Sequence, residues 1–441
     1  MIEDRPSFAE ATTTFARIGL LSFGGPAGQI ALMHRVLVDE KRWLDDARFL
    51  HALNYCMLLP GPEAMQLATY AGWLLHGVRG GLVAGLLFVL PGALAVTALT
   101  AIYLVAGDAP LVAGFLYGLK AAVLALVVEA LVKVSRRALK GPAMIVIALA
   151  AFVAIAFLKL PFPLIVLMAA IAGLTLHLMG RSGTGAAGGH GEEPAVETPG
   201  PDWTRPTLRR LFSTTSTWLA IWFVPLFALG LGLGWGHVFP AEGWFFSKMA
   251  AVTFGGAYAV LAYVAQQAVE VHGWLKPDEM LTGLGLAETT PGPLILVLVF
   301  VGFLGGARLS GLEPLVGGMA GAAVTLWFTF VPCFLWIFAG APYVETVRKV
   351  KWLAAALVAV TAAVVGIIAN LALWFGLHVL FAEMGDAALG PLILPSPDIQ
   401  TFDPLAAIIA LAAGVALIRY KANLFLVLGA AALAGVGSAF A

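Results

Sequence analysis

Leu58-Leu59-Pro60-Gly61-Pro62-Glu63-Ala64 is matched 231 residues later by Thr289-Thr290-Pro291-Gly292-Pro293-Leu294-Ile295. The same offset aligns Ser22-Phe23-Gly24-Gly25 with Thr253-Phe254-Gly255-Gly256, and also one Trp-Leu pair with its copy. No gap is needed across the 41 positions from 22 to 62, and 12 of them are identical. Shared hydrophobicity alone does not keep such landmarks in constant register, so the sequence predicts an internal duplication.

The composition is that of a membrane protein. Hydrophobic residues make up 61% of the 441 residues and charged residues only 11%, which excludes an ordinary soluble enzyme. Apolar runs of about 16 to 27 residues recur, and as helices such runs cross a hydrocarbon core of about 30 Å. The formal net charge is zero, so nothing indicates a nucleic-acid partner. Cys56 and Cys333 lie in apolar context and are expected to be buried hydrophobic residues rather than a disulfide.

The apolar pattern divides the chain into two similar halves, each with two broken helical hairpins followed by four spans. In the first half the hairpins are expected at about 8–33 and 49–76, with spans near 80–106, 111–132, 142–158 and 162–179. In the second half they are expected at about 240–264 and 279–305, with spans near 315–338, 352–376, 403–418 and 423–440. We therefore expect an all-α integral membrane protein with a transport repeat at 1–180, a solvated linker at 181–215, a connecting transmembrane helix at 216–235 and a second repeat at 236–441.

Basic residues alternate between equivalent loops of the two copies. The loop 34–48 carries Arg35, Lys41, Arg42 and Arg48, whereas its counterpart near 265–279 has Lys276 alone. Conversely, the turn 107–118 has no cation, whereas its counterpart carries Arg348, Lys349 and Lys351. Because Lys and Arg accumulate in cytoplasmic loops, this alternation predicts copies of opposite topology, provided that the broken hairpins are re-entrant. The linker is then cytoplasmic.

The glycine pairs and the Pro-Gly-Pro segments are expected to break helices at membrane depth. Proline removes an N–H donor and disfavours helix at the preceding residue, but it suits the first position of a new helix. Such backbone is tolerated only inside protein or beside an aqueous cavity, and a helix N-terminus binds anions. A simple packing kink is the alternative. The breaks supply these candidate substrate-binding residues: Ser22, Gly24, Gly25, Pro60, Gly61, Pro62, Glu63, Ala64, Thr253, Gly255, Gly256, Pro291, Gly292 and Pro293.

Two cations occupy equivalent positions in the copies. Arg17 and Lys248 each lie five residues before a Ser/Thr-Phe-Gly-Gly element. A cation inside an apolar segment costs about 2.5–3.5 kcal/mol on insertion scales, so it is a functional candidate. Two such cations suit a ligand with two negative charges. The alternative is that both side chains reach the membrane interface.

Acidic and amide side chains flank the Pro-Gly-Pro segments without matching one another. Glu63 directly follows Pro62 and could simply complement its helix end, whereas Glu288 precedes Pro291. Because Glu288 lies at the closing end of a half-helix, Glu288, Thr289 and Thr290 are candidates for proton coupling or hydroxyl ligation. Gln66 could donate to an oxyanion or to a neighbouring carbonyl. The sequence has no metal-spaced Cys/His set and no nucleotide-binding fingerprint, so no cofactor is expected.

Three segments closely resemble the chromate ion transporter family in its long, two-domain form. They are Ser22-Phe23-Gly24-Gly25-Pro26, the segment Leu58 to Ala64, and Ala287-Glu288-Thr289-Thr290-Pro291-Gly292-Pro293, and the resemblance covers nearly the whole chain. It implies a secondary transporter of the bacterial inner membrane that expels chromate and confers resistance, with sulfate as the natural isostere. Ala257 stands opposite Pro26, so identical pockets in both halves are not expected.

Electrostatics favours export. Moving one charge through 100 mV is worth about 2.3 kcal/mol, so a dianion leaving an inside-negative cell gains roughly 4.6 kcal/mol. Uptake of sulfate or another oxyanion with protons is the alternative within transport. A channel and an intramembrane enzyme that uses Glu63 with a histidine are more distant alternatives. The expected partners are the oxyanion and the lipid bilayer, and homodimer formation is left open.

Overall fold

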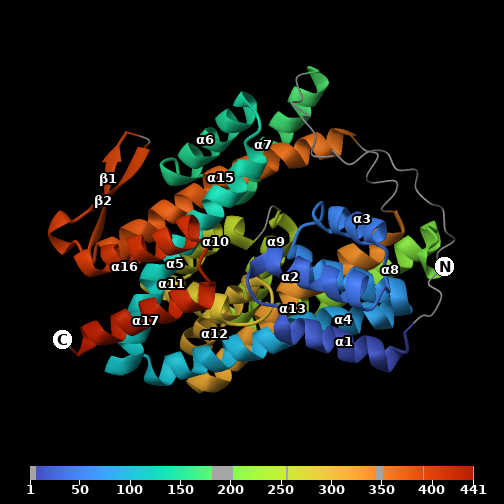
Figure 1. The fold of residues 1–441 in the computed structure, drawn as a ribbon, viewed down its shortest axis with the longest axis horizontal. Helices are drawn as coiled ribbons and strands as arrows, with labels where there is room; N and C mark the ends of the chain where they lie inside the picture. The colour runs from blue at the N-terminus through green and yellow to red at the C-terminus, as the bar shows by residue number, and fades with distance from the viewer. Residues whose placement is uncertain (1–5, 181–201, 255–256, 344–350, 391, 441) are drawn as a thin grey trace.

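The chain folds into the all-α membrane architecture expected from its sequence (Figure 1). The computed structural model describes residues 6–180, 202–254, 257–343, 351–390 and 392–440. In that part of the chain, five helical segments are long and apolar enough to cross a membrane: Glu63–Ala106, Pro110–Ala138, Leu208–Leu233, Pro314–Tyr343 and Trp352–Leu380.

The first copy begins with two broken hairpins. Its helices are α1 (Phe8–Leu21), α2 (Gly25–His34), the π-helical η1 (Arg35–Glu40), α3 (Asp46–Cys56), α4 (Glu63–Ala106), α5 (Pro110–Ala138), α6 (Pro142–Ala156) and α7 (Phe162–Leu178). Helix α4 is two helices joined by a kink at His76 and Gly77, where Gly77 has a φ of 61°. The part of α4 before the kink is the returning half of the second hairpin, and the part after it is the first full span.

The short η2 (Asp202–Thr204) and α8 (Leu208–Leu233) lead into the second copy. This copy consists of α9 (Val238–Val252), α10 (Ala257–Ala265), the π-helical η3 (Gln266–Val271), α11 (Pro277–Thr289), η4 (Leu294–Leu296), α12 (Val297–Leu309), α13 (Pro314–Gly340), η5 (Ala341–Tyr343), α15 (Lys351–Leu380), η6 (Ile399–Thr401), α16 (Pro404–Gly414), η7 (Val415–Arg419) and α17 (Leu424–Ala439).

The sequence repeat is preserved as a structural repeat. The π-helices η1 and η3 begin and end 231 residues apart, and so do the first residues of α3 and α11 and of α4 and η4. A π-helical turn is rare in proteins. Its recurrence at the same place in both copies therefore confirms the duplication at the level of backbone geometry.

The equivalent helices α5 and α15 pack against each other in antiparallel directions. Ala138 of α5 shares a buried cluster with Val365 of α15. Nearer the start of α5, the Leu124 side chain lies 3.7 Å from the point that a Cβ on Gly376 of α15 would occupy. Residue numbers thus rise along one helix as they fall along the other, which is the inverted relation predicted from the basic loops.

Each copy ends in a helical hairpin that packs on the other copy. Helices α6 and α7 lie on α15, whereas α16 and α17 lie on α5 (Figure 1). Glycines allow the backbones to touch, because a Cβ on Gly173 would lie 2.5 Å from Ala355 O and one on Gly118 would lie 1.9 Å from Ala431 O. Small residues commonly mediate close packing of membrane helices. The halves are therefore interlocked.

The structure refines the expected helix boundaries. Helix α8 begins at Leu208 rather than near 216, because Thr207 ends the extended segment and the polar residues that follow belong to a helical turn. The linker expected at 181–215 is correspondingly shorter, and residues 181–201 lie outside the described part of the chain. The last two helices of the first copy are short, since α6 contains 15 residues and α7 contains 17. At 1.5 Å per residue, 15 residues reach only about 22 Å, which is less than the hydrocarbon core.

A β-hairpin lies between α15 and α16 and was not predicted. Strand β1 (Met384–Leu389) pairs antiparallel with β2 (Leu392–Pro397), and the hairpin projects at the left edge of the molecule in Figure 1. Ile393 N–H donates to Phe157 O at 2.9 Å, which attaches the hairpin to the loop between α6 and α7. This contact spans more than 230 positions of the sequence, so local patterning gives no sign of it.

Candidate functional site

The two Pro-Gly-Pro segments, here called the first elbow (Pro60–Pro62) and the second elbow (Pro291–Pro293), are joined crosswise to the helix breaks of the opposite copy. Gly61 N–H donates to Thr253 O at 2.8 Å, and Gly292 N–H donates to Ser22 O at 2.7 Å. The two bonds are related by the 231-residue offset, since 22 and 253, like 61 and 292, are equivalent positions. All four helix breaks therefore meet around one pseudo-twofold centre, as the duplication predicted.

The elbows require glycine for two reasons. Gly61 and Gly292 have φ angles of 120° and 95°, which L-residues rarely adopt. A Cβ on Gly61 would also lie 2.9 Å from both Cys333 Sγ and Gln66 Nε2. At the second elbow the close neighbour is Gly92 of α4, where a Cβ would lie 1.9 Å from Pro291 O. Each elbow is thus pressed against a crossing helix.

The residues that open the breaks end helices α1 and α9. The Ser22 hydroxyl donates to Ile18 O at 2.6 Å, and the Thr253 hydroxyl donates to Met249 O in the same way. Both hydroxyl protons are therefore used within their own helix, while the carbonyls of Ser22 and Thr253 hold the elbows. Gly24 and Gly25 follow with φ angles of 83° and 72°. Their counterparts Gly255 and Gly256 lie outside the described residues.

Two buried glutamines bind the elbow carbonyls. Gln66 Nε2 donates to Pro60 O at 2.8 Å. Of the two partners that the sequence allowed for Gln66, an oxyanion or a neighbouring carbonyl, the structure shows the carbonyl. Gln29 Nε2 donates to Gly292 O at 2.6 Å, so it secures the second elbow from the first copy. Sequence reasoning missed Gln29, because its counterpart in the second copy is Val260 and the repeat gives no signal there. Within the described chain the Oε1 atoms of both side chains are buried without a partner.

Glu288 lies at the C-terminal end of α11 with its side chain 8% exposed. The Tyr258 hydroxyl donates to Glu288 Oε1, and the charges of Glu129 and Lys133 on α5 act on the same carboxyl group. Glu129 and Lys133 pair with each other at 2.6 Å. This polar group lies beside the second elbow, and the first elbow has no equivalent of Glu288, because Met57 occupies that position.

The other polar residues at the elbows have mostly local partners. The Thr289 and Thr290 hydroxyls donate to Leu286 O and Ala287 O of α11 at 2.8 and 2.9 Å. Glu63 is the first residue of α4 and is half-buried, and Pro62 before it and Ala64 after it are buried. The threonine hydroxyls thus keep only acceptor capacity for a further partner.

The matched cations Arg17 and Lys248 lie on exposed faces of α1 and α9. The Arg17 side chain is 59% exposed and its Nη1 is 3.5 Å from Glu40 Oε2 of η1. The structure therefore brings the elbows and the glycine breaks together. The exposed positions of the two cations are compatible with side chains that reach the membrane interface.

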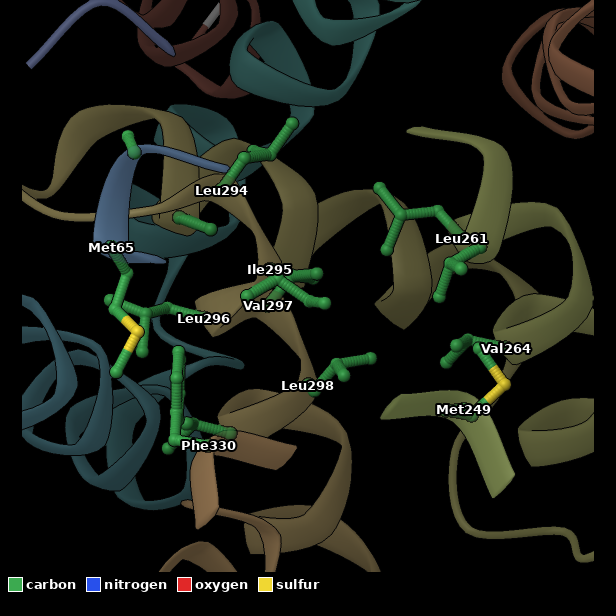
Figure 2. Packing of buried hydrophobic residues seen from close by; sticks show 14 of the residues in the cluster. Met65, Met249, Leu261, Val264, Leu294, Ile295, Leu296, Val297, Leu298 and Phe330 are labelled. Atoms are coloured by element: carbon green, nitrogen blue, oxygen red, sulfur yellow. The ribbon is translucent and has the colours of Figure 1, made fainter. Parts of the chain in front are cut away.

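Apolar side chains surround the second elbow. Figure 2 shows Leu294 to Leu298, where the chain leaves this elbow, with Met65 and Phe330 on one side and Met249, Leu261 and Val264 on the other. The polar atoms available to a ligand at this centre are accordingly those of the backbone and of the few buried polar side chains. Cys56 and Cys333 are both buried and free, as expected.

A cavity of about 860 Å³ opens away from the elbows, between the ends of α4, α5, α11, α12, α16 and α17. Arg308 donates to both carboxylate oxygens of Glu279 at 2.7 and 2.8 Å, and Tyr103 donates to Glu279 Oε1 at 2.9 Å. Lys120 Nζ is 2.9 Å from Asp278 Oδ2. The cavity brings together the turn after α4 and the loop before α11, which the alternation of basic loops predicted to share one side of the membrane.

Two inverted copies of one helical unit, whose broken helices meet and exchange hydrogen bonds at the centre, are typical of membrane transport proteins. The family model described as chromate transporter matches residues 9–174 and 242–436, which are the two copies. The chain therefore belongs to the chromate transporter family.

Proteins named as transporters align with most of this chain. It is 32% identical over 375 residues to a chromate transport protein of Pseudomonas aeruginosa, covering 82% of this chain and 79% of that protein. It is 28% identical over 354 residues to a chromate transport protein of Cupriavidus metallidurans, covering 80% and 79%. It is also 24% identical over 353 residues to an uncharacterized transporter of Methanocaldococcus jannaschii, covering 78% of each. No solved structure matches.

Proposed function

We propose that this protein exports chromate, or a dianionic oxyanion of the same shape such as sulfate, by alternating access around the paired elbows. The observation that carries the proposal is the reciprocal pair of hydrogen bonds, Gly61 to Thr253 and Gly292 to Ser22. It holds the starts of two half-helices, one from each copy, at a shared centre. Helix N-termini at such a centre stabilise negative charge without a dedicated cation.

The proposed site consists of the elbows, the first residues of the half-helices and the polar groups beside them. Glu63 and Ala64 begin one half-helix, and the backbone from Leu294 begins the other. Gln29 and Gln66 hold the elbow carbonyls away from the ligand, so that an oxyanion meets N–H groups rather than lone pairs. The Glu288, Thr289 and Thr290 group contributes at the second elbow alone, which makes the two halves of the site unequal.

The direction of transport follows from the charge of the ligand. A dianion that leaves an inside-negative cell gains roughly 4.6 kcal/mol at 100 mV, which supports a gradient of about a thousandfold. Export needs no other driving force. The proposal places the protein in the bacterial inner membrane with the linker on the cytoplasmic side, and such export would confer resistance to chromate.

Everted membrane vesicles test the proposal. The purified protein or its host membranes are given a membrane potential but no pH gradient, and chromate accumulation is measured with a fivefold excess of sulfate as competitor in a parallel sample. We expect accumulation that saturates with chromate and falls with sulfate. Absence of accumulation under potential alone would contradict potential-driven export. Flux that rises linearly with chromate would indicate a channel, and loss of preloaded chromate from an acidic lumen would favour proton-coupled uptake.

Substitution of Arg17 and Lys248 with glutamine decides whether the matched cations belong to the site. Because both side chains are exposed in the structure, we expect each variant to retain at least about half of wild-type chromate flux per molecule in the membrane. The measurement is initial flux in the same vesicles, normalised to protein level. Loss of flux in both variants at normal protein level would instead place the two cations on the oxyanion path.

A further inference from the structure

Glu242 is a buried carboxyl group that the proposed site does not use. It lies on α9, one turn from the start of the helix, and its exposed fraction is 0%. Among the described residues, neither carboxylate oxygen has a hydrogen-bond partner. The equivalent position in the first copy is Ala11, so the acid is specific to the second copy.

The surroundings of Glu242 are tightly packed and poor in donors. A Cβ added to Gly305 of α12 would lie 2.7 Å from Glu242 Oε1 and 3.1 Å from Trp274 Cγ, so the carboxyl group and the indole ring both lie against Gly305. On the other side, Gly243 faces Phe328 of α13, where an added Cβ would lie 2.8 Å from the ring. The carboxyl group is thus buried against α12, on a helix that also packs on α13.

Two further buried hydroxyl groups lie on α13, the helix that packs on both α9 and α12. Thr325 and Thr329 are on the same face of that helix, and their exposed fractions are 0% and 2%. Their Oγ1 atoms have no hydrogen-bond partner in the described part of the chain. Thr325 Oγ1 lies against Gly302, one turn before Gly305 on α12. Polar groups that are buried without partners are rare in proteins, so these hydroxyl groups and Glu242 require an explanation.

The charged and titratable groups around this interface are engaged elsewhere. Arg308 of α12 is bound by Glu279 and also donates to Trp274 O at 3.2 Å. His272 stacks on Trp274, and burial together with the positive charge of Lys248 lowers the pKa of its imidazole, so it is neutral near pH 7. Lys248 itself is exposed on α9. Helices α8 and α13 contribute apolar and hydroxyl side chains here.

An ionised carboxylate in this place would be costly. The effective penalty for burying an unpaired ion is several kcal/mol, and a group in such a place takes up a proton instead. Protonation avoids that cost. It is favoured only while α9, α12 and α13 remain packed together. When the helices separate and water reaches the group, a carboxyl group with an ordinary pKa near 4.3 releases its proton at neutral pH.

We propose that Glu242 is a proton-binding site of the transport cycle, which takes up a proton when α9 packs on α12 and α13 and releases it when they separate. This inference rests on the proposed function, since it assigns proton linkage to the same oxyanion transport. The bidentate Arg308 and Glu279 pair lies next to this interface and lines the 860 Å³ cavity.

The sign of the linkage is fixed by burial. Because the packed conformation binds one more proton than the opened one, low pH stabilises the packed conformation and high pH favours opening. One titrating group changes the balance by at most about tenfold per pH unit. Glutamine mimics the protonated acid in shape and charge, so Glu242→Gln should behave at every pH as the wild type does at low pH.

The test measures chromate flux in everted vesicles at a clamped membrane potential, with the same pH on both sides and pH varied between samples. We expect wild-type flux to change with pH with a slope of no more than about tenfold per unit. Flux of Glu242→Gln should stay constant, whereas the matched control Glu313→Gln, an exposed helix-capping carboxylate, should follow the wild type. Wild-type flux that is independent of pH, or a pH profile that Glu242→Gln retains, would overturn the inference.

Carbodiimide labelling and replacement of sodium test the same proposal in two further ways. If Glu242→Gln fails to accumulate, the wild-type protein is treated with a hydrophobic carbodiimide, which reacts with protonated carboxyl groups, and labelling is mapped by mass spectrometry. Labelling of Glu242 that falls as pH rises supports the inference, and its absence at every pH contradicts it. Replacement of sodium by choline should leave the pH profile unchanged, and a strict sodium requirement would replace the proton by a sodium ion. Absence of flux under potential alone would refute the proposed function separately.

Discussion

We expect Gly61→Leu and Gly292→Leu each to reduce chromate flux at least tenfold, although net charge is unchanged. A left-handed backbone costs an L-residue about 1–2 kcal/mol, and overpacking adds about 1–3 kcal/mol. Both glycines have positive φ, and a Cβ at Gly61 would meet Cys333 and Gln66. The elbow must therefore move, which breaks its hydrogen bond to the opposite copy. Chromate flux in everted vesicles, normalised to protein level, measures the effect.

Gly236→Leu is the matched control for the elbow variants. Gly236 lies in the exposed turn before α9, and no atom of the described residues lies within 4 Å of an added Cβ there. We expect flux within about twofold of the wild type, as for most surface substitutions. Elbow variants that transport as well as this control would show that neither Gly-Pro elbow needs its present backbone geometry.

We expect Gly118→Leu to prevent the two copies from interlocking and to destabilise the protein strongly. A Cβ at Gly118 of α5 would lie 1.9 Å from Ala431 O and 2.6 Å from its carbonyl carbon in α17. Because both are backbone atoms of a helix, no side-chain rotation relieves the overlap. We expect a loss of about 3 kcal/mol or more, measured as a lower midpoint of thermal unfolding in detergent and as reduced accumulation in the membrane.

Gly429→Leu on the partner helix α17 makes the same chemical change where there is room. Gly429 is exposed, and in the described part of the chain no atom lies within 4 Å of a Cβ added to it. Since glycine costs a helix about 1 kcal/mol relative to a good helix former, this variant should be as stable as the wild type or slightly more so. Equal thermal midpoints for the two variants would argue against close packing of α17 on α5.

The interlocked hairpins limit how the transporter can move. Because α6 and α7 lie on α15 while α16 and α17 lie on α5, each copy holds the principal long helix of the other. Separation of whole copies would break both of these interfaces at once. Movement of the half-helices within this frame, for example α9 against α12, breaks fewer contacts and is the conformational change that we expect to accompany oxyanion release.

Much of the fold was predictable from the repeat. The Pro-Gly-Pro and glycine-pair landmarks located the broken hairpins to within a few residues, because proline and glycine act through the local backbone. The basic loops predicted the inversion, which the antiparallel packing of α5 and α15 confirms. The β-hairpin and the early start of α8 were missed, since neither is marked by hydrophobic periodicity or by the repeat.

The candidate site was predictable only in part. The elbows and breaks were chosen correctly as elements that come together, but Gln29 was overlooked, and Arg17 lies on an exposed face, as the interfacial alternative expected. The repeat draws attention to residues that both copies share. Gln29 and Glu242 each occur in one copy only, so that signal is silent for both residues.

The sequence by itself determined that the chain is a duplicated membrane protein with four helix breaks and copies of opposite topology, because these properties follow from local backbone chemistry and from loop charge. Only the tertiary structure decided which break holds which elbow, that the terminal hairpins are exchanged, and that Glu242 is buried without a hydrogen-bond partner among the described residues. These features depend on contacts between residues tens to hundreds of positions apart. Their geometry comes from packing, so no pattern of neighbouring residues predicts it.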